Sequence, residues 1–250
     1  MRRVSVVSYL NSLPYLEGVM CFLPNDKWEI SVDPPGEIAR KLSLGHADVG
    51  LVPVAAIPGM KQARLINSYG IAANGPVNSV FLLSRRPIHE IQQVLLDFES
   101  RTSVALVRVL ARNFWKINCD FVQANEGYEN LIQGHTAGVI IGDRAIRAML
   151  DFEFRYDLSE AWKQMTSLPF VFARWVSCVE LENREIAEFT NALQRGLEQK
   201  DLLLQRLIEE QDWSPEFIIK YLKESILYKI DEDAERGMRL FLEQGKDFFY

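Results

Sequence analysis

Strand-like apolar segments alternate with helix-like segments in this chain, and this alternation restricts the fold more than any other feature. An extended segment at Val4–Val7 precedes a helix in which Pro14 suits the first turn. Residues 28–57 then give a strand, a Pro-Pro turn, a helix and a second strand at Asp48–Val52. Strands that alternate with helices favour an α/β fold with largely parallel strands.

The alternation restarts after Pro87, which indicates a second α/β unit. The apolar segment Leu168–Cys178 is long enough to run back to the first unit as a strand. Because the chain then passes between the units twice, near 80–86 and 170–178, we predict two lobes joined by a two-segment hinge. One lobe is residues 1–84 plus 175–250, and the other is residues 85–174. After Glu182 the pattern is helical to the end, which predicts a C-terminal helical tail.

The composition excludes several classes of partner. The 250 residues are 48% hydrophobic and 25% charged, which is ordinary for a globular protein with a sizeable core. A net charge of −6 without a basic stripe argues against nucleic-acid binding. The three cysteines are widely separated and have no spacing suited to zinc. The N-terminal segment lacks the long apolar stretch of a secretion signal, and no segment is apolar enough to cross a bilayer, so we expect a cytoplasmic protein.

Four strand ends are unusually polar. In open parallel sheets the ligand site lies beyond the carboxyl ends of the strands, so we expect these ends to meet in one cleft between the lobes. They are rich in hydroxyls, amides and glycine, which suits an anionic small molecule held by neutral donors. The residues at the four ends are Ser8, Tyr9, Asn11 and Ser12; Asn74, Gly75, Asn78 and Ser79; Ser100, Thr102 and Ser103; and Gly142 and Asp143.

The hydroxyl cluster at residues 100–103 has the clearest local chemistry. Ser100, Thr102 and Ser103 stand where a helix begins and its first backbone N–H groups lack partners, so hydroxyls, amides and the helix dipole can address one carboxylate or phosphate. The alternative is that Ser100 only caps the helix. Arg101 either pairs with the ligand or contacts Glu99 or solvent.

Two further residues have a structural and a functional interpretation. Asp143 follows a buried strand and starts a helix, so it either caps that helix or faces the ligand as an acid or base. Asn11 either caps the first helix or hydrogen-bonds a ligand hydroxyl or carboxylate. The residue pattern alone leaves both alternatives open.

Six sequence blocks, taken in order from about residue 3 to residue 177, resemble the MqnA family of menaquinone biosynthesis, the chorismate dehydratases of the futalosine route. The blocks are SYLNSLPY, DVGLVPVAAI, GIAANGPVNSV, SRTSVALVRVL, IIGDRAI and YDLSEAWKQMTSLPFVFARWV. A related enzyme that acts later in that route, on the cyclic futalosine product, usually opens with a Cys-Pro-Asn-Asp type of segment. The segment Ser-Tyr-Leu-Asn-Ser found here favours the dehydratase.

The resemblance implies a fold like that of type 2 periplasmic solute-binding proteins, with the ligand buried between two lobes. It also implies that chorismate loses water to give 3-[(1-carboxyvinyl)oxy]benzoate without a metal or an organic cofactor. The ligand-contacting positions it implies are Ser8, Asn11, Ser79, Thr102, Ser103 and Asp143.

This chemistry suggests roles for those residues. Thr102 and Ser103 are expected to hold one carboxylate, and Asn11 or Ser79 to orient the departing hydroxyl. The base is either Asp143 or the enolpyruvyl carboxylate of the substrate. Two other functions stay open, a non-catalytic small-acid binding protein of the same design and the later enzyme of the route. The oligomeric state is not indicated.

Overall fold

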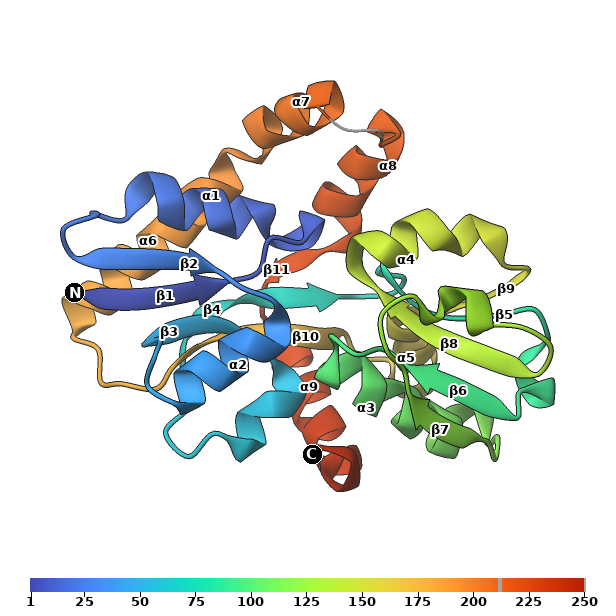
Figure 1. The fold of residues 1–250 in the computed structure, drawn as a ribbon. Helices are drawn as coiled ribbons and strands as arrows, with labels where there is room; N and C mark the ends of the chain where they lie inside the picture. The colour runs from blue at the N-terminus through green and yellow to red at the C-terminus, as the bar shows by residue number, and fades with distance from the viewer. Residues whose placement is uncertain (211–212, 250) are drawn as a thin grey trace.

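Two β-sheets lie side by side, each covered by helices (Figure 1). The computed structural model describes residues 1–210 and 213–249, and within these ranges the sheets have six and five strands. The first has the order β11-β4-β10-β3-β1-β2 and the second the order β7-β6-β8-β5-β9. The strands of the first sheet are β1 Arg2–Val6, β2 Trp28–Val32, β3 Val49–Pro53, β4 Arg64–Ala73, β10 Phe170–Ser177 and β11 Leu227–Lys229. Those of the second are β5 Val80–Ser84, β6 Gln93–Leu96, β7 Asp120–Gln123, β8 Thr136–Ile141 and β9 Phe154–Asp157.

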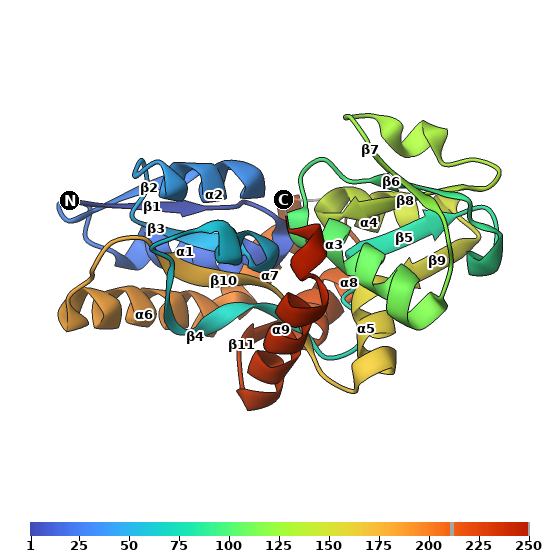
Figure 2. The same cartoon turned by 90° about the horizontal axis from the view of Figure 1, so that it is seen from below.

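The helices cover the faces of both sheets. In the view from below, α2 and α6 lie on opposite faces of the six-stranded sheet, as the amphipathic pattern of each helix requires (Figure 2). The helices are α1 Leu13–Phe22, α2 Pro35–Ser43, α3 Arg101–Leu110, α4 Gly142–Ala148, α5 Leu158–Thr166, α6 Asn183–Glu198, α7 Lys200–Glu210, α8 Pro215–Lys220 and α9 Glu232–Gln244. This arrangement confirms the α/β fold expected from the alternation of segments. Within the described residues, no helix is long and apolar enough to cross a membrane.

The chain passes between the two sheets twice, at residues 74–79 and at residues 158–169. The first connection joins β4 to β5, and the second contains α5 and leads from β9 to β10. Strand β5 therefore belongs to the five-stranded sheet and all of β10 to the six-stranded sheet. The boundaries between the sheets therefore fall at other residues than those predicted for the lobes, 1–84 plus 175–250 and 85–174. The division into lobes stays a prediction.

The prediction of largely parallel strands was wrong. The pairs β1–β2, β1–β3, β6–β7 and β6–β8 are parallel, but every pair formed by β5 or β10 is antiparallel. Strands β5 and β10 each follow a connection from the other sheet, so neither ends a crossover that starts from a strand of its own sheet, as parallel neighbours need. Both sheets are therefore mixed.

The prediction of a purely helical tail after Glu182 was also wrong, because β11 pairs antiparallel with β4 at the sheet edge. Burial alternates through this segment: Ile226, Tyr228 and Ile230 are buried while Lys229 is exposed. This is the period of two expected for a strand with one face against the core. A strand of three residues is too short for the sequence pattern to separate it from the surrounding helices.

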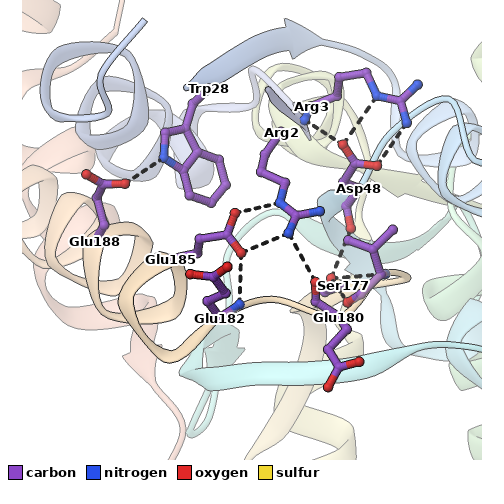
Figure 3. Close-up of polar contacts among 10 residues, drawn as sticks. Arg2, Arg3, Trp28, Asp48, Ser177, Glu180, Glu182, Glu185 and Glu188 are labelled. Carbon is purple, nitrogen blue, oxygen red and sulfur yellow. Dashed lines mark hydrogen bonds and ion pairs between the residues drawn. The ribbon is translucent and has the colours of Figure 1, made fainter. Parts of the chain in front are cut away.

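Ion pairs fasten α6 to the start of β1, at the end of the sheet far from the second lobe (Figure 3). Arg2 Nε lies 2.6 Å from Glu185 Oε1, and the indole Nε1 of Trp28 donates to Glu188 at 2.9 Å. Arg3 Nη2 lies 2.8 Å from Asp48 Oδ1, next to β3. The contacts of Arg2 and Trp28 join two strands to α6, so they fix how α6 lies across the sheet.

Helices α1 and α6 cross at two glycines. A Cβ atom added to Gly196 would lie 2.1 Å from the carbonyl oxygen of Pro14 and 2.7 Å from the Cα atom of Gly18. Both distances are too short for any side chain, so glycine on both helices allows their backbones to touch. The crossing fixes α1, whose first turn follows directly on the loop that carries Asn11.

Candidate functional site

A cleft lies between the two sheets, with about 650 Å³ of space free of protein atoms, including its opening to solvent. This is within the usual range for a small-molecule site. Its walls come from both lobes, and the described residues that line it include no Lys, Arg or His. Lining residues with polar side chains are Tyr9, Asn11, Ser79, Glu99, Ser100, Thr102 and Ser103, and apolar ones include Val7, Leu51, Ile71, Val77, Ile141 and Phe172.

Four of the six predicted site residues line this cleft. These residues are Asn11, Ser79, Thr102 and Ser103. Ser8 is exposed and is not among the residues that line the cleft. Asp143 lies beside the cleft, in an adjoining hollow that it shares with Tyr9 and Glu99. The ends of β1, β6 and β8 therefore do meet, but the side chains at these ends do not all point into the same space.

The start of α3 places its three hydroxyls differently. Ser100 caps the helix, because its Oγ accepts a hydrogen bond from the Ser103 backbone N–H at 3.1 Å. Ser100 also lines the cleft, so the capping and the ligand-facing interpretations are compatible. The Thr102 hydroxyl accepts from the Ala55 N–H and donates to the Phe172 carbonyl, both at 3.2 Å. Thr102 therefore connects α3 to the other lobe and has no hydroxyl proton left for a ligand in this arrangement.

Asp143 does not cap its own helix. The residue before α4 is Ile141, and the Oδ1 atom of Asp143 accepts a hydrogen bond from the Leu10 backbone N–H at 3.3 Å. This bond joins the two lobes at the edge of the cleft. Burial raises the pKa of the Asp143 carboxyl, while the Leu10 N–H and the charge of Arg147 oppose that shift. A carboxyl with a raised pKa is a better proton acceptor than an exposed one.

Asn11 does not cap α1 either, because the N-cap of that helix is Ser12. The Ser12 hydroxyl donates to the Val7 carbonyl at 2.7 Å and stabilises the turn that follows β1. Asn11 is left to face the cleft. Arg101 is exposed and lines a different crevice, on the other side of α3, together with Phe248 and Phe249.

A second pair of contacts joins the lobes where the cleft meets the adjoining hollow. The Tyr9 hydroxyl, from the first lobe, donates to Glu99 Oε2 at 2.9 Å, and its ring lies against Gly142 at the start of α4. Gly142 has a φ of +63°, where glycine is the residue without strain. Arg144 in turn lies 3.3 Å from Glu99 and 2.5 Å from the buried Asp97. Glu99 is thus held between a phenol from one lobe and a guanidinium from the other.

The comparison with protein families decides the assignment. A family model described as menaquinone biosynthesis matches residues 2–247, which is nearly the whole chain. The chain belongs to this family. The matched range includes the carboxyl ends of both sheets and the tail helices, so the cleft is a feature of the matched sequence and not of an added segment.

Two proteins that are similar in sequence to this family member are named chorismate dehydratase. The protein of Thermus thermophilus is 32% identical over 161 residues, which is 56% of this chain and 58% of that protein. The protein of Campylobacter jejuni is 26% identical over 251 residues, which is 96% of each. The alignment to the Thermus protein thus spans little more than half its length, whereas the Campylobacter alignment is nearly complete.

A solved structure confirms the fold of this family member. A Candida albicans protein, described as having the generic periplasmic binding protein fold, superposes with a TM-score of 0.70. The match covers 99% of this chain and 90% of that one, at 11% sequence identity. At that identity the likeness concerns the fold alone. The two-lobed architecture expected from the sequence is therefore confirmed.

Sequence reasoning missed Glu99 at the cleft and one polar residue directly behind it, Tyr221. The Tyr221 hydroxyl donates to Ser79 Oγ at 2.8 Å, although it lies 142 positions further along the chain. In the sequence, Trp213, Phe217 and Tyr221 form an aromatic stripe at helical spacing, which is typical of a core face. No local signal separates the tyrosine with a polar partner from its apolar neighbours. Among the described residues, no group of His, Cys, Asp and Glu is arranged to hold a metal ion.

Proposed function

We propose that this protein converts chorismate into 3-[(1-carboxyvinyl)oxy]benzoate by loss of water, as a step of the futalosine route to menaquinone. The observation that carries the proposal is the similarity to the Campylobacter jejuni chorismate dehydratase along 96% of both chains. The family match over residues 2–247 supports the same pathway. A cytoplasmic location is part of this proposal.

The cleft suits the chemistry of this substrate. Chorismate has two carboxylates, and the ring carboxylate is conjugated through an alkene to the carbon that loses a proton. Negative charge formed at that carbon spreads toward the carboxylate, so hydrogen-bond donors at the carboxylate stabilise the transition state. The start of α3 offers unpartnered backbone N–H groups and Ser103 at the cleft wall. The apolar walls exclude water around the developing charge.

We assign the residues of the cleft as follows. Ser103 and the first turn of α3 hold one carboxylate, and Thr102 keeps that turn in place through its bonds to the other lobe. Asn11 and Ser79, which also line the cleft, address the hydroxyl that departs. Ser8 is kept as an expected contact only for a substrate group that reaches out of the cleft, because its side chain is exposed.

Two groups compete for the role of base. Asp143 has a carboxyl with a raised pKa at the cleft edge, and the enolpyruvyl carboxylate of the substrate lies next to the ring proton by covalent structure. In both cases the proton leaves the ring carbon, the C–O bond breaks, and the proton and hydroxide leave together as water. An Asp143→Asn variant separates the two, because only the first mechanism loses most of its turnover.

Incubation of the purified protein with chorismate tests the proposal. We expect the ultraviolet spectrum to change as an aromatic ring forms, and the product mass to be that of chorismate minus one water. Binding of chorismate without conversion would instead indicate a non-catalytic small-acid binding protein. Conversion of the cyclic futalosine product, with chorismate left intact, would move the protein to the later step of the route.

The Asn11→Ala variant tests whether the Asn11 amide takes part in the reaction. Removing an amide that stabilises the transition state is expected to lower kcat by about 100-fold with a small change in KM. The measurement is steady-state kinetics of chorismate loss. Equal changes in kcat and KM, or no change, would contradict the role assigned to Asn11.

A further inference from the structure

Tyr221 stands directly behind the cleft wall, although it is far from the residues of that wall in the sequence. It begins a π-helical turn, Tyr221–Ser225, that directly continues α8. Its side chain is buried, and its hydroxyl donates to Ser79 Oγ at 2.8 Å. Ser79 lines the cleft and Tyr221 does not, so the tyrosine stands directly behind a residue that faces the ligand. π-helical turns inside helices are frequent at functional sites.

The π-helical turn holds the connection between the sheets at two adjacent residues. Besides the bond from Tyr221 to Ser79, the Asn78 amide Nδ2 donates to Ser225 Oγ at 3.0 Å. Asn78 has a φ of +59°, and its backbone N–H donates to Asp157 Oδ2 at 2.7 Å. The backbone that leads into Ser79 is therefore fixed from both sides in a conformation that few residues adopt.

The Tyr221 ring itself has little freedom. It stacks on Phe217 with ring centroids 5.6 Å apart and an angle of 12° between the ring planes. Burial raises the pKa of the Tyr221 hydroxyl above its ordinary value, while hydrogen bonding to Ser79 and Asn11 opposes that shift. The phenol therefore keeps its proton throughout the physiological pH range and serves as a permanent donor.

Counting protons gives the direction of the hydrogen bonds. The Tyr221 hydroxyl has one proton and gives it to Ser79. Ser79 accepts from Tyr221, so its own hydroxyl proton stays available on the side of the cleft. The hydroxyls of Tyr221 and Ser79 thus form a chain of donors that ends at the cleft, and each bond in such a chain strengthens the next.

Comparison with Tyr228 shows that burial alone does not give a tyrosine hydroxyl a hydrogen-bond partner in this protein. Its hydroxyl is also buried, and it has no hydrogen-bond partner within the described residues. Tyr228 lies in the same tail, only seven positions after Tyr221. The fold thus tolerates one buried phenol without a partner, while the other is directed at a residue of the cleft.

We propose that Tyr221 is a positioning residue of the dehydration, which orients the Ser79 hydroxyl so that it donates to the oxygen leaving chorismate. This inference rests on the proposed function. The leaving oxygen gains negative charge as its bond to carbon breaks, so a donor already aimed at it lowers the barrier. A serine with a freely rotating hydroxyl would have to give up that freedom in the transition state.

Comparison of Tyr221→Phe with Tyr228→Phe tests the proposal. Each variant removes one buried hydroxyl and keeps the ring, and only the first removes a bond to Ser79. We expect Tyr221→Phe to lower kcat by about tenfold with KM changed less than twofold, and Tyr228→Phe to behave as the unaltered protein. Thermal unfolding of both variants checks that they are folded, and Tyr221→Met replaces Tyr221→Phe if the latter unfolds below the assay temperature.

A double-variant cycle separates positioning from general stability. In a Ser79→Ala background, Tyr221→Phe is expected to cost less than threefold in kcat, because the hydroxyl it orients is already gone. The same tenfold loss in both backgrounds, or equal losses for Tyr221→Phe and Tyr228→Phe, would overturn the inference. If the unaltered protein leaves chorismate intact, the proposed function fails instead, which is a different result from either of these.

Discussion

Thr102 shows how much a single hydroxyl depends on its surroundings. From the sequence, Ser100, Thr102 and Ser103 are equivalent donors at a helix start. In the structure Ser100 caps the helix, Thr102 joins the two lobes, and Ser103 is left at the wall of the cleft. The position of the cluster was predictable because helix starts have unpartnered N–H groups. The division of roles was not, because Ala55 and Phe172, the partners of Thr102, are distant in sequence.

The hydroxyls of α3 lead to a binding prediction. Replacing both Thr102 and Ser103 by alanine is expected to weaken binding of the benzoate product by about tenfold, which is the effect of losing a hydrogen bond to a charged group. Ser103→Ala alone is expected to cause most of that loss. Calorimetric titration measures it, with Thr190→Ala on α6 as a control. Unchanged binding in the double variant would show that the carboxylate lies elsewhere.

At the scale of elements, the strands and helices were predictable in kind but not in direction. Alternating apolar and amphipathic segments identify β1, α2 and α3 directly, because β1 is a short, mostly buried strand and the two helices are amphipathic. The antiparallel pairing of β10 depends on where the chain re-enters the first sheet, and no local pattern records that. The short edge strand β11 was missed for a related reason, since it is fixed by β4 and not by its own length.

The crossing of α1 and α6 supports a stability prediction. Gly196→Ala would place a methyl group 2.1 Å from the Pro14 carbonyl oxygen, so the helices must move apart. We expect the free energy of unfolding to fall by about 2–3 kcal/mol, as for other overpacked sites. Gly36→Ala in α2 is the control, because a Cβ there has no neighbour within 4 Å. Denaturant unfolding measures both, and equal midpoints would contradict the prediction.

At the scale of the whole molecule, the two connections between the sheets meet at one carboxyl. Asp157, the N-cap of α5, accepts from the Ser159 and Glu160 N–H groups on one connection and from the Asn78 N–H on the other. The sequence predicted two crossings because two α/β patterns are separated by a boundary. It did not indicate that a buried acid ties the crossings together, because Asp157 is distant in sequence from Asn78.

Asp157 makes the stability of the molecule depend on pH. Burial raises its pKa to about 6, with backbone N–H donors opposing the shift, and an unfolded chain has an Asp pKa near 3.9. The folded state therefore holds the proton more tightly, so its stability falls as pH rises from about 4 to about 7, by up to about 3 kcal/mol. Asp157→Asn, which cannot titrate, is expected to lack this fall. Urea unfolding at several pH values measures the difference, and parallel curves for the two proteins would refute it.

Ser79 at the cleft wall and Tyr221 behind it enter the polypeptide at widely spaced moments of its synthesis. A ribosome completes the first two strands and the entire five-stranded sheet well before it adds the tyrosine. A nascent fragment therefore has every residue that lines the cavity and lacks only the tyrosine that holds Ser79 from behind. The pocket and the orientation of its serine are therefore supplied by different parts of the chain, so a change in the later segment can alter the second without altering the first.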